Sequence, residues 1–169
     1  MPVTPFHLGP GLLLKALARP CFSLSVFGFV QVVLDAEVVI ALLRSRSPLH
    51  CVLHTYAGAS AAALAGVVVG RPCCVWLKRR WNAGLPAELR ARLRLPEPIT
   101  FAAAVTGALS GAYSHILLDS LMHPDMKPLA PWTGRNVLLD VVGFWPLYLL
   151  CLAVGLVGAH LLNRRGGRR

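Results

Sequence analysis

The sequence predicts an all-α, polytopic membrane protein: one helical bundle with about four spanning helices, a short N-terminal re-entrant helix and an interfacial helix. Two observations predict this class. Of the 169 residues 56% are hydrophobic and only 14% are charged, with a mean hydropathy of +0.61. Soluble domains carry about 25% charged residues. In addition, long apolar runs recur along the whole chain, which leaves no room for a separate soluble domain.

The first expected element is a short helix over residues 6–18 or so, ended by Arg19-Pro20. It is too short to span, because about 20 apolar residues are needed to cross the hydrocarbon core. It can form a re-entrant hairpin with the span that follows. At about 1.5 Å of rise per residue, this hairpin would return His7 to the depth of Asp35.

The four spans are expected over about residues 22–43, 52–76, 99–122 and 139–162. Runs without a formal charge underlie three of them: 22 residues from Leu49 to Gly70, 20 from Ile99 to Leu118 and 23 from Val141 to Asn163. Each run is long enough to cross a bilayer as a helix. The second and third spans also carry Gly-x-x-x-Gly motifs, at Gly66 and Gly107, which favour close helix packing in lipid.

The segment 78–98 interleaves leucines at helical spacing with arginines. Its helix should start on Pro86, a good first-turn residue, and end before Pro96. We expect an interfacial helix that contacts anionic lipid head groups on the cytoplasmic leaflet. An ordinary solvated loop helix is the alternative.

The net charge of +10 is explained by topology. Thirteen of the 17 lysines and arginines fall in the tip after residue 14, the segment after the second span and the basic tail 163–169. The positive-inside rule places these three segments in the cytoplasm. The bilayer is therefore the expected partner, and no nucleic acid is needed to explain the charge; the oligomeric state is left open.

Ionisable residues gather at the opposite, non-cytoplasmic ends of the spans. Five of the six histidines and four of the seven acidic residues lie there: His7, Asp35, Glu37, His50, His54, His115, Asp119, His123 and Asp125. A lone histidine in an apolar helix is more often a hydrogen-bonded core residue. A cluster this dense, however, would be costly in lipid and needs positive charge to balance its carboxylates, which a metal ion supplies.

The spacing also suits a metal. His50 and His54, and likewise His115, Asp119 and His123, follow one another at one helical turn, and Pro124 should end the helix so that His123 can turn inward. The candidate ligands are His7, Asp35, His50, His54, His115, Asp119 and His123. Their nitrogen and oxygen donors favour one or two divalent transition ions, zinc first, with manganese, iron or nickel as alternatives.

Four side chains receive further candidate roles. Asp35 and Glu37 are the candidate catalytic carboxylates, with Glu37 as the base that takes a proton from water. Asp125 either orients a histidine ligand or is a turn residue after Pro124. Lys127 either contacts an oxyanion or phosphate at the mouth of the site or is an ordinary exposed lysine.

Four segments resemble the YdjM-like group of small bacterial membrane proteins, which are described as metal-dependent hydrolases. They are "PFHLGPGLLLKAL", "VLDAE", "PLHCVLHT" and "SHILLDSLMHPDMKPLAPW", in the same order along nearly the whole chain. The resemblance implies the bacterial inner membrane and metal-ligand or catalytic roles for His7, Asp35, His50, His54, His115 and Asp119. The group often has Pro-Asp-x-Asp in its first span, where this chain has Leu34 and Glu37.

The first functional hypothesis is a metal-dependent hydrolase of an ester or phosphoester, with a lipid-linked substrate suggested by the site's position at the outer edge of the membrane. The second is a metal-binding or metal-transporting protein without catalysis. Transport is disfavoured because a path should continue polar groups to the other face, and the cytoplasmic halves of the later spans offer few. A bis-histidine haem bundle is the third, and the crowded acids speak against it.

Overall fold

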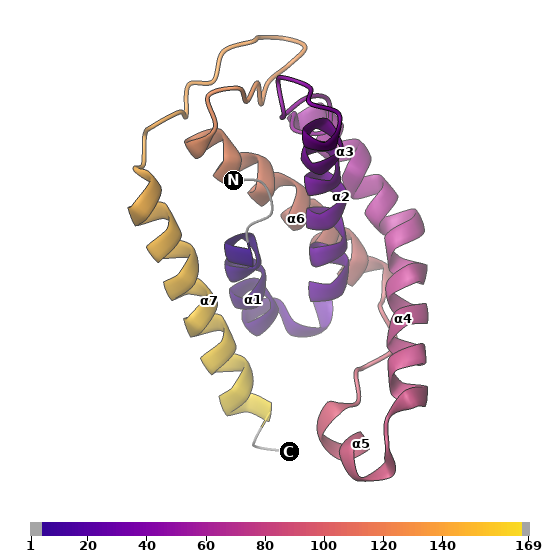
Figure 1. The fold of residues 1–169 in the computed structure, drawn as a ribbon. Helices are drawn as coiled ribbons and strands as arrows, with labels where there is room; N and C mark the ends of the chain where they lie inside the picture. Colours follow the sequence, from indigo (N-terminus) through magenta and orange to yellow (C-terminus); the bar gives the residue numbers. More distant parts are fainter. Residues whose placement is uncertain (1–4, 167–169) are drawn as a thin grey trace.

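The computed structural model describes residues 5–166, and helix is the only regular secondary structure among them (Figure 1). The elements in order are η1 (Pro5–His7), α1 (Leu8–Ala18), η2 (Arg19–Cys21), α2 (Leu24–Leu43), α3 (Tyr56–Ala65), η3 (Gly66–Gly70), α4 (Arg71–Gly84), α5 (Ala87–Leu93), α6 (Phe101–Met122) and α7 (Phe144–Gly166). The last three residues of the basic tail, 167–169, lie outside the described residues.

Four helices are long and apolar enough to cross a membrane: Leu24–Leu43, Tyr56–Gly84, Phe101–Met122 and Phe144–Arg164. The predicted fold class is therefore confirmed. The second of these helices joins α3, η3 and α4 without a break. Its π-helical part, η3, ends two residues before Pro72, which lacks the N–H needed for a regular helical hydrogen bond.

Side-chain caps determine where three of these helices begin. Ser23, Thr55 and Thr100 each accept a hydrogen bond from the amide three residues ahead, at 3.3, 2.9 and 3.1 Å respectively. Such caps satisfy amides that the first helical turn leaves unpaired. The second span consequently starts at Tyr56, four residues later than the sequence predicts.

Two further boundaries differ from the expectation. The sequence predicts that the second span ends at residue 76, but α4 continues to Gly84, because the next proline after Pro72 is Pro86. The interfacial segment predicted over 78–98 therefore contributes only α5 as a separate helix. The fourth span starts at Phe144 and not at 139, because Asp140 has a φ of 59°, outside the right-handed helical region.

The short helix α1 packs against α7 through glycines. Beside α7 in Figure 1, α1 runs to a hairpin turn that points toward the end of the bundle where α5 lies. A Cβ on Gly9 would collide with the carbonyl oxygen of Cys151, and one on Gly158 with the backbone of Leu13. At the turn, Lys15 Nζ donates to the carbonyl oxygens of Arg19 and Phe22, at 2.7 and 2.8 Å. The re-entrant hairpin is thus held at its side and at its tip.

The core lies where α2, α3 and α6 meet. Valines of α2 pack on alanines of α3 and α6, and the residues include Val26, Val30, Leu34, Ala59, Ala62, Ala104, Ala108 and Ile116. Gly111 of α6 lies against Phe27 of α2, where a Cβ would come within 2.9 Å of the Phe27 carbonyl oxygen. Close contact of this kind is typical of membrane helices, which lack a hydrophobic driving force between them.

Candidate metal centre

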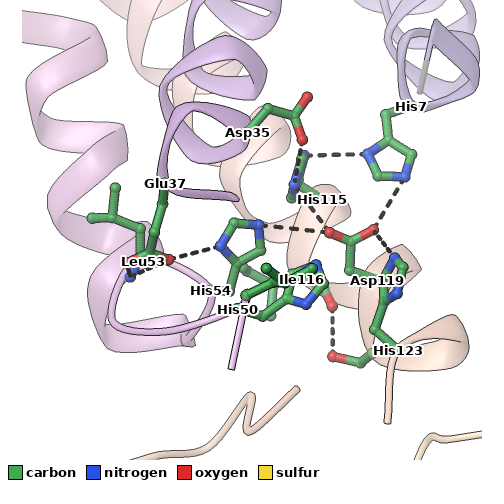
Figure 2. Close-up of polar contacts among 12 residues, drawn as sticks. His7, Asp35, Glu37, His50, Leu53, His54, His115, Ile116, Asp119 and His123 are labelled. Atoms are coloured by element: carbon green, nitrogen blue, oxygen red, sulfur yellow. Dashed lines mark hydrogen bonds and ion pairs between the residues drawn. The ribbon is translucent and has the colours of Figure 1, made fainter. Parts of the chain in front are cut away.

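The predicted ionisable residues meet at the end of the bundle where the long α6–α7 loop lies (Figures 1 and 2). They come from separate elements. The η1 turn contributes His7; α2 contributes Asp35 and Glu37; the loop between α2 and α3 contributes His50 and His54; and the end of α6 contributes His115, Asp119 and His123. The hairpin returns His7 to this end, so that its Nδ1 lies 3.2 Å from Nδ1 of His115.

Asp119 occupies the centre of the cluster. Its Oδ1 lies 3.4 Å from His7 Nε2 and 3.8 Å from His123 Nε2. Its Oδ2 lies 3.1 Å from His115 Nε2 and 3.7 Å from His54 Nε2. Each oxygen of this buried carboxylate therefore faces two imidazole nitrogens.

These separations suit a coordinated ion. Two donors at about 2.1 Å from a tetrahedral zinc ion lie roughly 3.4 Å apart. The four distances around Asp119, from 3.1 to 3.8 Å, are of that size. Three groups bring their donor atoms within 4.8 Å of one another: His7, His115 and Asp119; His50, His54 and Asp119; and His50, His123 and Asp125. Such groups can hold a metal ion.

The hydrogen bonding of these nitrogens is a second test of the fit. The Nε2 atoms of His7, His54 and His115 are buried and have no hydrogen-bond partner in the described structure; their nearest acceptors are carboxylate oxygens at 3.1 to 3.7 Å. A buried polar atom without a partner costs free energy, and such atoms are rare in folded proteins. Metal ligation beside Asp119 would give these nitrogens a partner, so the residues present fit the group.

In three of the histidines the other ring nitrogen, Nδ1, lies beside a side-chain oxygen. His54 Nδ1 lies 2.9 Å from Glu37 Oε2, and His50 Nδ1 lies 2.9 Å from Asp125 Oδ1. His115 Nδ1 contacts Oε1 of Gln31. When Nδ1 donates its hydrogen to such an oxygen, the lone pair of Nε2 is left for a metal. This arrangement is typical of histidines that bind metals.

Glu37 faces the back of the cluster. Its carboxylate accepts hydrogen bonds from the amides of Cys51, Val52 and Leu53 at 2.9 to 3.3 Å, besides the contact with His54. Figure 2 shows it beyond His54 as seen from Asp119. This geometry favours a positioning role over the general-base role that the sequence suggests, because both oxygens are already engaged.

Asp125 holds the loop from its other end. Its Oδ2 accepts from the amides of Leu49 and His50 at 3.0 and 3.2 Å. Burial opposes its ionisation, but the hydrogen bonds from His50 outweigh burial and keep the pKa of Asp125 below its usual range. Burial also lowers the pKa of His50, and the nearby His54 lowers it further. A lowered pKa favours the neutral imidazole, which is the form that ligates a metal.

The loop corrects one expectation about local structure. The sequence places His50 and His54 one turn apart on a helix, but both precede Tyr56, where α3 begins. Glu37 and Asp125 bind the amides of this segment and so keep them out of helical hydrogen bonds. The two rings nevertheless meet, with centroids 4.8 Å apart.

Two candidate residues lie at the margin of the cluster. Asp35 Oδ1 is 3.6 Å from His115 Nε2, and its side chain is 14% exposed, so water reaches it more readily than it reaches Asp119 at 6%. Lys127 is exposed and contacts none of the cluster residues, but it lines the same surface cleft as His50.

Gln31 is a site residue that the sequence analysis missed. Its Nε2 donates to the carbonyl oxygen of Gly111 at 3.1 Å, and its Oε1 contacts His115 Nδ1. Gln31 thus connects the cluster to the backbone of α6. Its position one helical turn before Asp35, in an otherwise apolar run, was the available signal. Asn136 was also missed; it donates to the carbonyl of Ser120 at 2.8 Å and fastens the α6–α7 loop to α6.

Comparison of the chain with protein-family models, with curated proteins and with solved structures finds no match.

Proposed function

We propose that this protein is a membrane-embedded, metal-dependent hydrolase of an ester or phosphoester. The observation that supports it best is the buried Asp119 carboxylate, with four imidazole Nε2 atoms within 3.8 Å of its two oxygens. The resemblance to the YdjM-like group, with its placement in the bacterial inner membrane, belongs to the same proposal. So does the orientation that puts the site near the non-cytoplasmic side.

Two sets of residues would hold a metal, and Asp119 belongs to both. They are His7, His115 and Asp119, and His50, His54 and Asp119. The donors favour zinc, with manganese or iron as alternatives. When bound, such an ion lowers the pKa of a water and polarises the ester oxygen.

Asp35 is the residue best placed to take the proton of the attacking water. It contacts the ligand His115, and no backbone amide of the described residues donates a hydrogen bond to it. The carboxylates of Glu37 and Asp125 are more exposed, but backbone amides already occupy their oxygens. Overall, water adds across the ester bond and gives an acid and an alcohol, so no oxidant or reductant is required.

Transport of a metal is a weaker candidate. Between Gln31 and the opposite end of the bundle, the core consists of Val26, Val30, Ala104 and Ala108. Among the described residues, Ser23 is the only buried polar residue on that side. An ion crossing the bundle would need polar groups along its route. Haem binding is also disfavoured, because His50 and His123 stack with centroids 4.4 Å apart and leave no space for a porphyrin between them.

The lipid contacts of the cytoplasmic end complete the proposal. The apolar helices imply contact with lipid in general. We further propose that arginines near α5 bind anionic head groups there. The Cζ of Arg80 lies 5.9 Å from the centroid of the Trp76 ring, and Trp76 is 57% exposed. An exposed tryptophan paired with an arginine is suited to the membrane–water interface.

The first test is metal content by mass spectrometry on protein purified without chelators. We expect one or two transition ions per chain in the wild type and a loss of most of that metal in Asp119→Asn. The matched control is Asp140→Asn, the same chemical change at an exposed acid of the α6–α7 loop. Wild-type protein without metal would overturn the proposal.

Activity separates a hydrolase from a protein that only binds metal. Asp35→Asn should keep most of the metal and lower kcat on a chromogenic ester or phosphodiester by about 100-fold or more, the usual contribution of a general base. Metal-loaded wild type that turns over none of these substrates would favour the non-catalytic alternative.

A further inference from the structure

A cleft runs beside the candidate metal centre, between the loop that precedes α3 and the start of the α6–α7 loop. Its volume is about 450 Å³, within the range of small-molecule sites. His50, a candidate ligand, forms part of its wall, and Lys127 lines it as well. The cleft therefore joins the cluster to the surface.

The two walls are tied together. The amide of Tyr56 donates to the carbonyl oxygen of Pro128 at 2.8 Å. The amide of Ala130 donates to the carbonyl oxygen of Lys127 at 3.0 Å and closes a turn there. A Cβ at Gly58 would collide with the carbonyl oxygen of Val52, so the loop is seated directly on α3. The cleft is thus a built feature of the fold.

The lining has a charged part and an apolar part. Lys127 is exposed, and no ion pair within the described residues involves it. Most of the remaining lining is apolar, with Val52, Ala57 and Pro131 among it, and Val52 is 72% exposed. One cation beside an apolar trough is complementary to a molecule with one anionic group and one hydrocarbon chain.

The position of the cleft fits such a molecule. It adjoins the end of a spanning helix, and Trp132, next to Pro131, is 77% exposed. Exposed tryptophans are typical of the level of the lipid head groups. A chain on this side can remain in the bilayer while its head enters the cleft.

We propose that this cleft binds an amphiphilic phosphate ester, with its phosphate between Lys127 and the metal centre at His50 and its hydrocarbon chain along Val52 and Ala57. The inference rests on the proposed function and specifies its substrate class. A phosphate held in this place lies next to the histidine ligands, where water could attack it.

Binding is tested on the full chain in phosphatidylcholine nanodiscs by native mass spectrometry. The probe is lysophosphatidic acid, compared with a monoacylglycerol of the same chain and with glycerol 3-phosphate as competitor. Lys127→Gln removes the positive charge, and Lys127→Arg keeps it. Ala57→Trp fills the apolar part of the cleft. Arg135→Gln is the control, because Arg135 is an exposed cation of the same loop that does not line the cleft.

We expect the wild type to prefer lysophosphatidic acid over the monoacylglycerol. Lys127→Gln should weaken lysophosphatidic acid binding about tenfold, the usual loss for one hydrogen bond to a charged group. Ala57→Trp should weaken it as well, whereas Lys127→Arg and Arg135→Gln should bind like the wild type.

Two results would overturn the proposal. The first is equal binding of lysophosphatidic acid by the wild type, Lys127→Gln and Ala57→Trp. The second is displacement of bound lysophosphatidic acid by glycerol 3-phosphate as effectively as by free lysophosphatidic acid, which would identify a site for soluble phosphate esters. Metal content is measured on each preparation. Wild type that binds the lipid without metal would refute the hydrolase alone, and metal-loaded wild type without this binding pattern would refute the cleft alone.

Discussion

Replacing Glu37 by Gln should weaken metal binding while leaving the chemical step largely intact. The carboxylate receives hydrogen bonds from three amides, and His54 Nδ1 lies 2.9 Å away. Glutamine has nearly the same shape, but its NH₂ group can only donate. It would therefore point a donor at a group that itself donates, either the amides of the loop or the ring of His54.

The size of the effect follows from these contacts. Losing one or two hydrogen bonds to a charged group costs about 1.5–3 kcal/mol each. Part of that loss falls on the orientation of His54 and part on the loop that carries it. Removing the partner of a histidine ligand typically lowers metal affinity 10–100-fold, and we expect the Kd of Glu37→Gln to rise by about that amount.

The assay is equilibrium dialysis against graded chelator, followed by metal analysis and by kcat measured at saturating metal. Glu97→Gln is the matched control; Glu97 contacts Asn82 and Arg79 at the far end of the bundle. Metal affinity within threefold of the wild type, together with a kcat lowered more than 100-fold, would refute the positioning role and restore Glu37 as the base.

Three further predictions use other parts of the structure. Gln31→Leu removes one contact of His115 Nδ1 and one hydrogen bond to the Gly111 carbonyl, and should lower metal affinity about tenfold in the same dialysis assay. Unchanged affinity would show that the contact is incidental. Gly9→Val should destabilise the protein by about 1–3 kcal/mol in thermal unfolding, since its side chain would meet the Cys151 backbone, while Gly84→Ala, with no atom within 4 Å of the new Cβ, is the control. Asp125→Asn should loosen the loop, which is measured as faster amide exchange of Leu49 and His50, and should thereby lower metal affinity. Amide exchange at the wild-type rate would contradict the role of this carboxylate.

The sequence by itself determined the fold class and the membership of most of the cluster. Spans follow from local composition, because about 20 consecutive apolar residues can lie in the hydrocarbon core only as a helix. The spacing of His115 and Asp119 likewise brings their side chains together on any helix, and the structure has them 3.1 Å apart. Pro124 marked the end of α6 for the same local reason, and His123 is indeed its cap.

Only the tertiary structure decided how the residues divide their work. His7 and His115 are separated by 108 positions, so their contact depends on the packing of α1 against α7 and not on any local period. The same holds for Glu37, which sequence spacing grouped with Asp35 but which the loop engages through three amides. Contacts with a distant segment of the chain produce no periodic pattern in the sequence. For that reason only the folded chain shows the central position of Asp119, the contact of Gln31 with His115 and the cleft that Lys127 lines.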